Sequence, residues 1–182
     1  MILRGQLHIH TTCSDGELTP QEVANAYADL GLDFIAFTDH DHLINSDYEK
    51  NIMQVRSELI MFHGVELTVF EKGYFHLNKI VGEQEMLHIF NHPAEHGLKV
   101  KQVIERLQLL SQKYPIDAVE ITSHGFYTEE FDIPEIGYPK LASDDSHSWT
   151  GCCRAWIEVE SNRDKDSILR AIKRGDFRNC YA

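Results

Sequence analysis

Histidine and carboxylate residues recur along this chain in patterns that suit metal coordination. The chain holds 11 histidines among 182 residues. His8 and His10 lie two residues apart in an apolar segment, and side chains at that spacing on a strand point to the same face. Asp145 and His147 repeat the spacing with one carboxylate and one imidazole. Mixed ligand sets of this kind suit Zn²⁺, Mn²⁺ or Fe.

Most of the candidate ligands directly follow a run of apolar residues that is typical of a buried strand. His40 follows residues 34–37, and His92 follows residues 86–90. In a closed or doubly wound α/β sheet, the carboxyl ends of the strands meet at one face, where active sites lie. The residues expected at that face are His8, His10, Asp15, His40, Glu66, His92, His124, Asp145 and His147. Because one such ion takes about four to six ligands, this set is sufficient for two or three divalent ions.

The elements that must position these residues are predicted by the alternation of short apolar runs with amphipathic segments. This alternation favours β/α units around a parallel sheet. About seven principal strands are expected, over residues 2–9, 34–37, 60–69, 86–90, 118–121, 139–142 and 155–159, with residues 74–81 returning from Gly73 as a hairpin. Helices are expected over residues 20–30, 46–59 and 100–110, with a last one around residues 168–172 that ends at Gly175. Thr19 and Glu22 have the spacing of a capping box at the start of the first helix.

The composition predicts a single α/β domain over residues 1–182. The formal net charge is −12, from 17 Lys and Arg against 29 Asp and Glu. A surface this acidic repels polyanions, so no binding to duplex nucleic acid is expected. No apolar run reaches the ~20 residues of a membrane helix, and no signal peptide is recognised. We therefore expect a cytoplasmic protein without a membrane partner, with its four cysteines reduced; the sequence leaves the oligomeric state open.

The expected ions would make the site attractive to phosphate. Asp15, Glu66 and Asp145 contribute three negative charges, whereas three divalent ions would contribute six positive ones. A local net charge of about +3 in an otherwise acidic protein favours a small phosphorylated substrate.

Five segments, in this order, resemble motifs of the polymerase and histidinol phosphatase (PHP) family. They are residues 8–16 (HIHTTCSDG), 38–41 (TDHD), 64–66 (GVE), 91–93 (NHP) and 145–147 (DSH). The resemblance extends through residues 151–181 and thus covers nearly the whole chain. It implies a distorted (β/α)7 TIM-like barrel with up to three metal ions at the carboxyl ends of its strands.

The resemblance also implies how the ions divide their ligands. One ion is expected among His8, His10, Glu66 and Asp145, a second among Glu66, His92 and His124, and a third among Asp15, His40 and His147.

The implied activity is that of a metal-dependent phosphoesterase, a phosphatase or phosphodiesterase, acting on a small phosphorylated compound. Water that bridges two divalent ions loses a proton near neutral pH. A metal-bridging hydroxide is therefore the expected nucleophile, and no protein side chain is assigned that role. His96 and Arg154 are candidate contacts to the substrate phosphate, with Lys79 and Lys140 as weaker candidates.

Two other functions fit the same pattern of residues. A metal-dependent amidase or other C–N hydrolase is one, because a fold does not determine its chemistry. Such enzymes often use a carbamylated lysine between the metals, and no lysine follows a strand here in the company of the candidate ligands. The other hypothesis is a non-catalytic metal-binding domain. Loss of candidate ligand residues from the motifs would indicate it, and none of the core positions is lost.

The remaining polar residues of these segments are expected to have supporting roles. Structural roles are assigned to His63, His76 and His88. His42 is left open between a surface residue and a pocket contact. Asp39 and Asp41 are expected to orient neighbouring ligands or to cap their loop.

Overall fold

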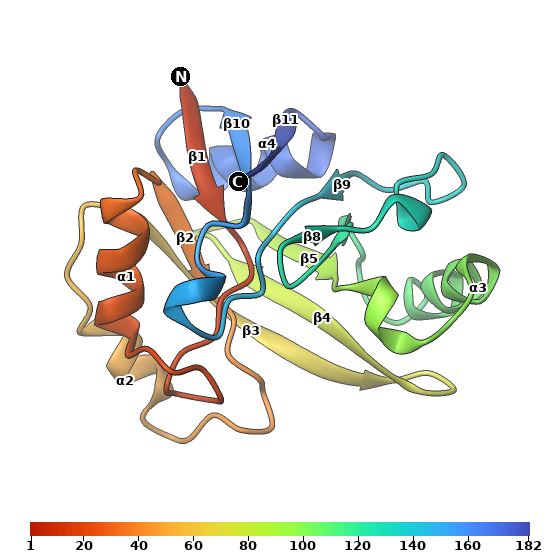
Figure 1. Cartoon of the computed structure of the whole chain (residues 1–182), viewed down its shortest axis with the longest axis horizontal. Helices are drawn as coiled ribbons and strands as arrows, with labels where there is room; N and C mark the ends of the chain where they lie inside the picture. Colours follow the sequence, from red (N-terminus) through yellow and green to blue (C-terminus); the bar gives the residue numbers. More distant parts are fainter.

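The protein is built around one strongly curved sheet whose strands come from the whole length of the chain (Figure 1). The computed structural model describes residues 1–182. Nine strands pair in the order β11-β10-β1-β2-β3-β4-β5-β6-β9. They are β1 (Ile2–Gln6), β2 (Phe34–Phe37), β3 (Ile60–Phe70), β4 (Tyr74–Val81), β5 (Met86–Phe90), β6 (Ala118–Glu120), β9 (Lys140–Leu141), β10 (Ala155–Glu160) and β11 (Phe177–Tyr181). A separate small hairpin joins β7 (Thr122–Ser123) to β8 (Phe126–Tyr127).

Four α-helices accompany the sheet. They are α1 (Pro20–Asp29), α2 (Tyr48–Met53), α3 (Val100–Leu110) and α4 (Lys165–Arg174), with short 3₁₀ turns η1 (Pro93–His96), η2 (Glu129–Phe131) and η3 (Trp149–Gly151). The predicted capping box of α1 is present, because Thr19 Oγ1 accepts the Glu22 amide and Glu22 Oε2 accepts the Thr19 amide at 2.8 Å. A membrane span is not found among these helices, since none combines the required length and apolarity.

The barrel-like α/β class is confirmed, but the sheet is not a regular repeat of seven β/α units. Strands β1, β2 and β3 run parallel, as do β5, β6 and β9. The pairs β3–β4, β4–β5, β1–β10 and β10–β11 are antiparallel. An antiparallel pair needs only a tight turn, whereas a parallel pair needs a crossover, so β3, β4 and β5 follow one another without helices. Helix α2 lies in the crossover between the parallel strands β2 and β3, and it is shorter than the predicted helix over residues 46–59.

A side chain completes the barrel where its two edge strands meet. Asn179 on β11 accepts the Ala142 amide through Oδ1 at 2.8 Å and donates through Nδ2 to the Lys140 carbonyl at 2.9 Å. These two bonds replace the backbone ladder that β9 and β11 do not form. They also anchor the chain immediately before Asp144 and Asp145.

Three apolar clusters occupy the interior and the outer layers. The inner cluster joins Leu3 of β1, Ile80 of β4 and Leu7, just after β1, with Ile168 and Leu169 of α4. Helices α1 and α2 cover one outer face of the sheet, and α3 covers another (Figure 1). Apolar side chains and α4 occupy the end of the barrel at which the parallel strands begin. The space at the carboxyl ends of these strands is therefore left to polar residues.

Candidate metal centre

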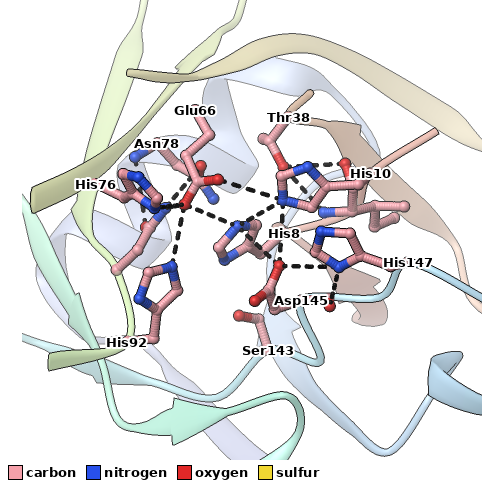
Figure 2. Close-up of polar contacts among 12 residues, drawn as sticks. His8, His10, Thr38, Glu66, His76, Asn78, His92, Ser143, Asp145 and His147 are labelled. Carbon is pink, nitrogen blue, oxygen red and sulfur yellow. Dashed lines mark hydrogen bonds and ion pairs between the residues drawn. The ribbon is translucent and has the colours of Figure 1, made fainter. Parts of the chain in front are cut away.

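The nine residues expected at the carboxyl ends of the strands form one connected cluster in the barrel mouth. Figure 2 shows six of them, His8, His10, Glu66, His92, Asp145 and His147. Each has a nitrogen or carboxylate oxygen within 3.5 Å of another member of the set. His8, His10, Glu66, His92 and Asp145 are buried, Asp15 and His124 are exposed, and His40 and His147 lie between these extremes. The sequence argument that strand ends bring these residues together therefore describes their actual placement.

Glu66 occupies the middle of the cluster. Its Oε1 lies 3.2 Å from His8 Nε2 and 3.1 Å from His92 Nε2. Its Oε2 lies 3.3 Å from His10 Nε2 and 2.9 Å from His40 Nδ1. Glu66 reaches this position because β3 extends beyond the end of β2. There an isolated bridge pairs Glu66 with His40, in the loop that follows β2.

Asp145 closes the other side of the cluster. Its Oδ1 lies 3.2 Å from His8 Nε2 and 3.1 Å from His10 Nε2, and its Oδ2 lies 3.4 Å from His124 Nδ1. Three members of the site have positive φ angles that non-glycine residues rarely adopt, +46° at Asp145, +46° at His124 and +24° at His92. Such conformations cost about 1–3 kcal/mol each and concentrate at functional sites.

The loop that presents Asp15 is held by Asp39 and by a close backbone contact. Asp39 Oδ1 accepts the Thr11 amide at 2.8 Å and the Ser14 hydroxyl at 2.6 Å. A Cβ on Gly16 would lie 2.6 Å from the His10 carbonyl carbon. Only glycine therefore lets this loop fold back on His10 and place Asp15 Oδ1 3.4 Å from His10 Nδ1.

The ligand atoms gather into five overlapping groups, within each of which they lie no more than 4.8 Å apart. The groups are His10, Asp15, His40 and His147; His8, His10 and Glu66; His8, His92 and Asp145; His40, Glu66 and His76; and His124, Asp145 and His147. The implied set of Asp15, His40 and His147 thus lies together, with His10 added. His124 lies beside Asp145 and Glu95 and is not grouped with Glu66 and His92.

Buried polar atoms without hydrogen bonds show that the site suits divalent ions. Among them are Nδ1 of His10, His40, His76 and His92, Oε2 of Glu66 and Oδ1 of Asp145. Buried polar atoms are normally hydrogen-bonded, but these atoms lack hydrogen bonds and face one another, as Glu66 Oε2 and His40 Nδ1 do at 2.9 Å. Ligand atoms around a cation are arranged in this way. Imidazole nitrogens and carboxylate oxygens are the donors that Zn²⁺, Mn²⁺ and Fe accept. The residues present therefore fit such ions.

In the metal-free protein, protons bound to the buried imidazoles balance part of the negative charge of the carboxylates. Burial disfavours the imidazolium, but the surrounding carboxylates raise the pKa of His8, raise the pKa of His10 to about 10 and raise that of His92 to about 9. Against the effect of their own burial, the neighbouring histidines hold the pKa values of Glu66 and Asp145 well below the usual range. The site therefore contains imidazolium–carboxylate pairs that metal ions would displace.

Glu120 is a site residue that sequence reasoning missed. It is fully buried on β6, with Oε2 3.2 Å from His8 Nδ1 and 2.9 Å from the His92 amide, which donates to it. Oε1 accepts from Thr122 Oγ1 at 3.3 Å and from the Ser143 hydroxyl. The available signal was the charged residue in an otherwise apolar strand, Val119-Glu120-Ile121.

His76 was predicted to have a structural role, but it lies in the cluster beside Glu66. Its Nδ1 is 3.2 Å from Glu66 Oε1. Its ring makes edge contacts with the rings of His40 and His92, at centroid distances of 5.1 and 5.3 Å. Figure 2 shows His76 beside Glu66. The signal for this placement was the hairpin turn at Gly73 together with the alternation of side chains along β4.

The other histidines lie outside the cluster. His88 Nδ1 is 3.7 Å from Asp117, near the far end of the barrel. His63 lines an outer cavity with Lys79, away from the candidate ligands. His42 is exposed at the rim, where its Nδ1 lies 3.2 Å from Thr68 Oγ1.

The two candidate phosphate contacts are placed differently. His96 packs behind His92 against Phe75 and Phe90, and burial lowers its pKa to about 4, so its imidazole is neutral. The Arg154 guanidinium lies at the rim, 5.2 Å from the ring centre of Phe126, and Nη1 donates to the His124 carbonyl at 3.3 Å. Arg154 lines a cavity of about 190 Å³ together with His124, Asp144, Asp145, His147, Ser148 and Gly151.

Comparisons with known proteins point to the same type of site. A family model described as the PHP domain matches residues 6–149. No curated protein sequence matches the chain.

Several solved structures have a similar fold. A two-domain protein from Bacteroides vulgatus ATCC 8482, described as containing a predicted PHP-like metal-dependent phosphoesterase, is 18% identical with a TM-score of 0.76; the match covers 100% of this chain but only 65% of that protein. An amidohydrolase from Chromobacterium violaceum, solved with bound sulfate and no metal, is 15% identical with a TM-score of 0.65, over 79% of this chain and 87% of that one. PsfC from Pseudomonas syringae PB-5123 is 10% identical with a TM-score of 0.64, over 100% of this chain and 92% of that one.

Proposed function

The chain belongs to the PHP domain family, and from this membership we propose that it is a metal-dependent phosphoesterase acting on a small phosphorylated compound. The observation that carries the proposal is the convergence of nine imidazole and carboxylate side chains in the barrel mouth, with unpaired buried ligand atoms among them. Either a phosphatase or a phosphodiesterase agrees with this arrangement.

We propose that two or three divalent ions, of Zn, Mn or Fe, bind in this cluster. The group of His10, Asp15, His40 and His147 would hold one of them, and the group of His8, His92 and Asp145 a second. When bound, such ions polarise phosphoryl oxygens and lower the pKa of water to near neutrality.

For His147 and His8, the chain itself sets which imidazole nitrogen would face the ions. His147 Nδ1 lies 3.0 Å from the Asp145 carbonyl, to which it can only donate, so that Nε2 is left as the ligand atom. Glu120 does the same for His8, because its carboxylate accepts from Nδ1 while Nε2 faces Glu66 and Asp145. Partners of this kind orient metal-bound histidines and increase their basicity.

Arg154 is the candidate contact to the substrate phosphate. Arg154 lines the cavity beside His124 and Asp145. A planar guanidinium that is always charged suits phosphate oxygens. We infer that water is the nucleophile, because burial raises the pKa of the Cys152 thiol and its Sγ is engaged with Ser146 Oγ at 3.3 Å. His96 is not retained as an anion contact, since its neutral ring packs behind His92.

The proposal is tested by metal analysis and hydrolysis assays on the purified protein. We expect bound divalent metal, and turnover of p-nitrophenyl phosphate or bis-p-nitrophenyl phosphate with Mn²⁺, Zn²⁺ or Fe²⁺. Glu66→Gln should lower kcat/KM by more than about 100-fold, since even the loss of an outer partner of a metal site costs 10–100-fold. Glu158→Gln, at the opposite end of the barrel, is the matched control and should leave turnover unchanged.

Three outcomes would count against the proposal. Absence of both bound metal and turnover with all three ions would refute it. Bound metal without any turnover would favour a non-catalytic domain. Hydrolysis of amides but not of phosphoesters would favour the C–N hydrolase hypothesis, which the amidohydrolase from Chromobacterium violaceum supports at the level of the fold only.

A further inference from the structure

The turn of the β7–β8 hairpin places its backbone directly against Arg154. His124 and Gly125 are the two central residues of this turn, with φ angles of +46° and +83°. Positive φ at both positions is what a two-residue hairpin turn of type I′ requires. A Cβ on Gly125 would lie 2.5 Å from the Cβ of Arg154 and 3.3 Å from its Cδ. Gly125 therefore forms the turn and also lets the aliphatic part of Arg154 lie on the peptide backbone.

Two further contacts from the same hairpin hold the guanidinium of Arg154. Its Nη1 donates to the His124 carbonyl at 3.3 Å. Its Cζ lies 5.2 Å from the ring centre of Phe126, within the range of a cation–π contact. The Phe126 ring is 65% exposed, so burial of apolar surface explains little of its position. The hairpin thus contacts the Arg154 side chain along its whole length, from Cβ to the guanidinium.

Arg154 forms no ion pair with a carboxylate, although the chain has 29 acidic residues against 17 basic ones. Arg4 and Arg178, by contrast, both pair with Glu158. Arg154 instead lines the cavity of about 190 Å³ that Asp145 also lines. A guanidinium held in one orientation loses less conformational freedom when it binds an anion. Arg154 is therefore a cation prepared for phosphate oxygens beside the candidate metal centre.

We propose that Gly125 and Phe126 are positioning residues that set the Arg154 guanidinium for binding the phosphate group of the substrate. This inference rests on the proposed function, since it concerns the same phosphate site. Neither residue needs to touch the phosphate, because both act through Arg154. A dianionic monoester gains more from a fixed cation than a monoanionic diester does, because the Coulomb energy scales with the product of the charges. The hairpin should therefore contribute more to the binding of a monoester than to that of a diester.

The test is a double-mutant cycle of Phe126 and Arg154, in which calorimetry measures the binding of inorganic phosphate to the metal-loaded protein. Phe126→Leu should weaken phosphate binding about 2–5-fold, the equivalent of an exposed cation–π contact, and Phe126→Tyr should restore it. Arg154→Met should weaken it roughly tenfold or more. In the Arg154→Met background, Phe126→Leu should have no further effect, since no guanidinium is left to position. Phe70→Leu is the matched control, because the Phe70 ring is also 65% exposed but contacts Tyr74.

Gly125→Ala and Gly97→Ala separate the contact with Arg154 from backbone strain. Both glycines have positive φ, +83° and +62°, but a Cβ on Gly97 would meet nothing within 4 Å. Gly125→Ala should weaken phosphate binding by at least about 2–5-fold. It should also raise KM more for p-nitrophenyl phosphate than for bis-p-nitrophenyl phosphate. Gly97→Ala should leave phosphate affinity and both KM values unchanged.

The outcomes separate this inference from the proposed function. If the wild-type protein hydrolyses phosphoesters and the effects of Phe126→Leu and Arg154→Met simply multiply, only the positioning role is overturned. The same conclusion follows if Phe126→Leu binds phosphate as tightly as the wild-type protein. If the wild-type protein binds phosphate without turnover, the proposed function fails and the cycle still decides this inference; if it binds no phosphate, both fail. If Gly125→Ala does not fold, as judged by circular dichroism, the cycle at Phe126 decides alone.

Discussion

Replacing Glu120 by glutamine tests whether this fully buried carboxylate orients His8 and His92 in the metal centre. His8 holds the pKa of Glu120 below its usual range despite the opposing effect of burial, so the side chain is ionised. It accepts from His8 Nδ1 and from the His92 amide, and glutamine keeps one acceptor and nearly the same shape. The substitution therefore removes charge while it disturbs packing little.

The expected magnitude follows from the contacts that lose their charge. A hydrogen bond to a charged partner contributes about 1.5–3 kcal/mol, against about 0.5–1.5 kcal/mol for a neutral one. The change at His8 should thus weaken metal binding by about 1–2 kcal/mol, roughly 5–30-fold at 1.4 kcal/mol per tenfold. Glu120→Ala is a harsher change, because it leaves the His92 amide and His8 Nδ1 buried without an acceptor. It should destabilise the protein by about 3–5 kcal/mol.

The assay combines Co²⁺ titration with urea unfolding of the metal-free and loaded proteins. Glu158→Gln is the control, since Glu158 also belongs to the sheet but pairs with Arg178 at the other end of the barrel. If Glu120→Gln binds Co²⁺ within about threefold of the wild-type protein and unfolds at the same urea concentration, the reasoning that an outer carboxylate orients His8 is wrong.

Three further predictions follow from pH, barrel closure and backbone strain. His10 and His92, with pKa values of about 10 and 9 in the metal-free protein against an ordinary value of 6.5, carry protons at pH 7 that metal must displace. Calorimetry should therefore detect proton release on binding, and affinity should rise between pH 7 and 9; affinity independent of pH would contradict this. The same raised pKa values stabilise the metal-free fold fully below pH 6.5, and this contribution should be lost as pH rises through 9–10. Asn179→Ala removes both bonds that join β9 to β11, so it should lower the free energy of unfolding by about 1–3 kcal/mol and weaken metal binding; an unchanged urea midpoint would show that the edges need no such link. His124→Gly should stabilise the metal-free protein by up to about 1 kcal/mol relative to His124→Ala, because glycine relieves the positive φ, and equal stability of the two variants would exclude strain there.

The barrel class and most of the site were accessible from the sequence because their signals are local. Apolar runs identified most of the strands, although not β7, β8 or β11. Thr19 and Glu22 identified the start of α1, and Gly73 identified the hairpin turn. Polar residues directly after buried strands were then expected to meet, because parallel strands share their carboxyl ends. Nine residues of the cluster were named in this way.

The number of β/α units was not accessible in the same way. The β3–β4 hairpin was predicted from Gly73, but nothing in the apolar run of β5 indicated that it pairs antiparallel with β4. The antiparallel pairing of β10 with β1 depends on contacts between segments far apart in the chain. Local apolar patterns do not distinguish these pairings from parallel ones, since a strand buried on both faces has the same composition in either direction.

By itself, then, the sequence determined which residue types gather and in which order along the chain, because a strand end and a turn are properties of a few adjacent residues. The tertiary structure alone decided that His76 and Glu120, both within strands, also belong to the centre. It also decided which nitrogen of each imidazole faces inward and where the backbone adopts positive φ. These features depend on strand register and on packing across the barrel, where a shift of one residue turns a side chain to the opposite face of the sheet.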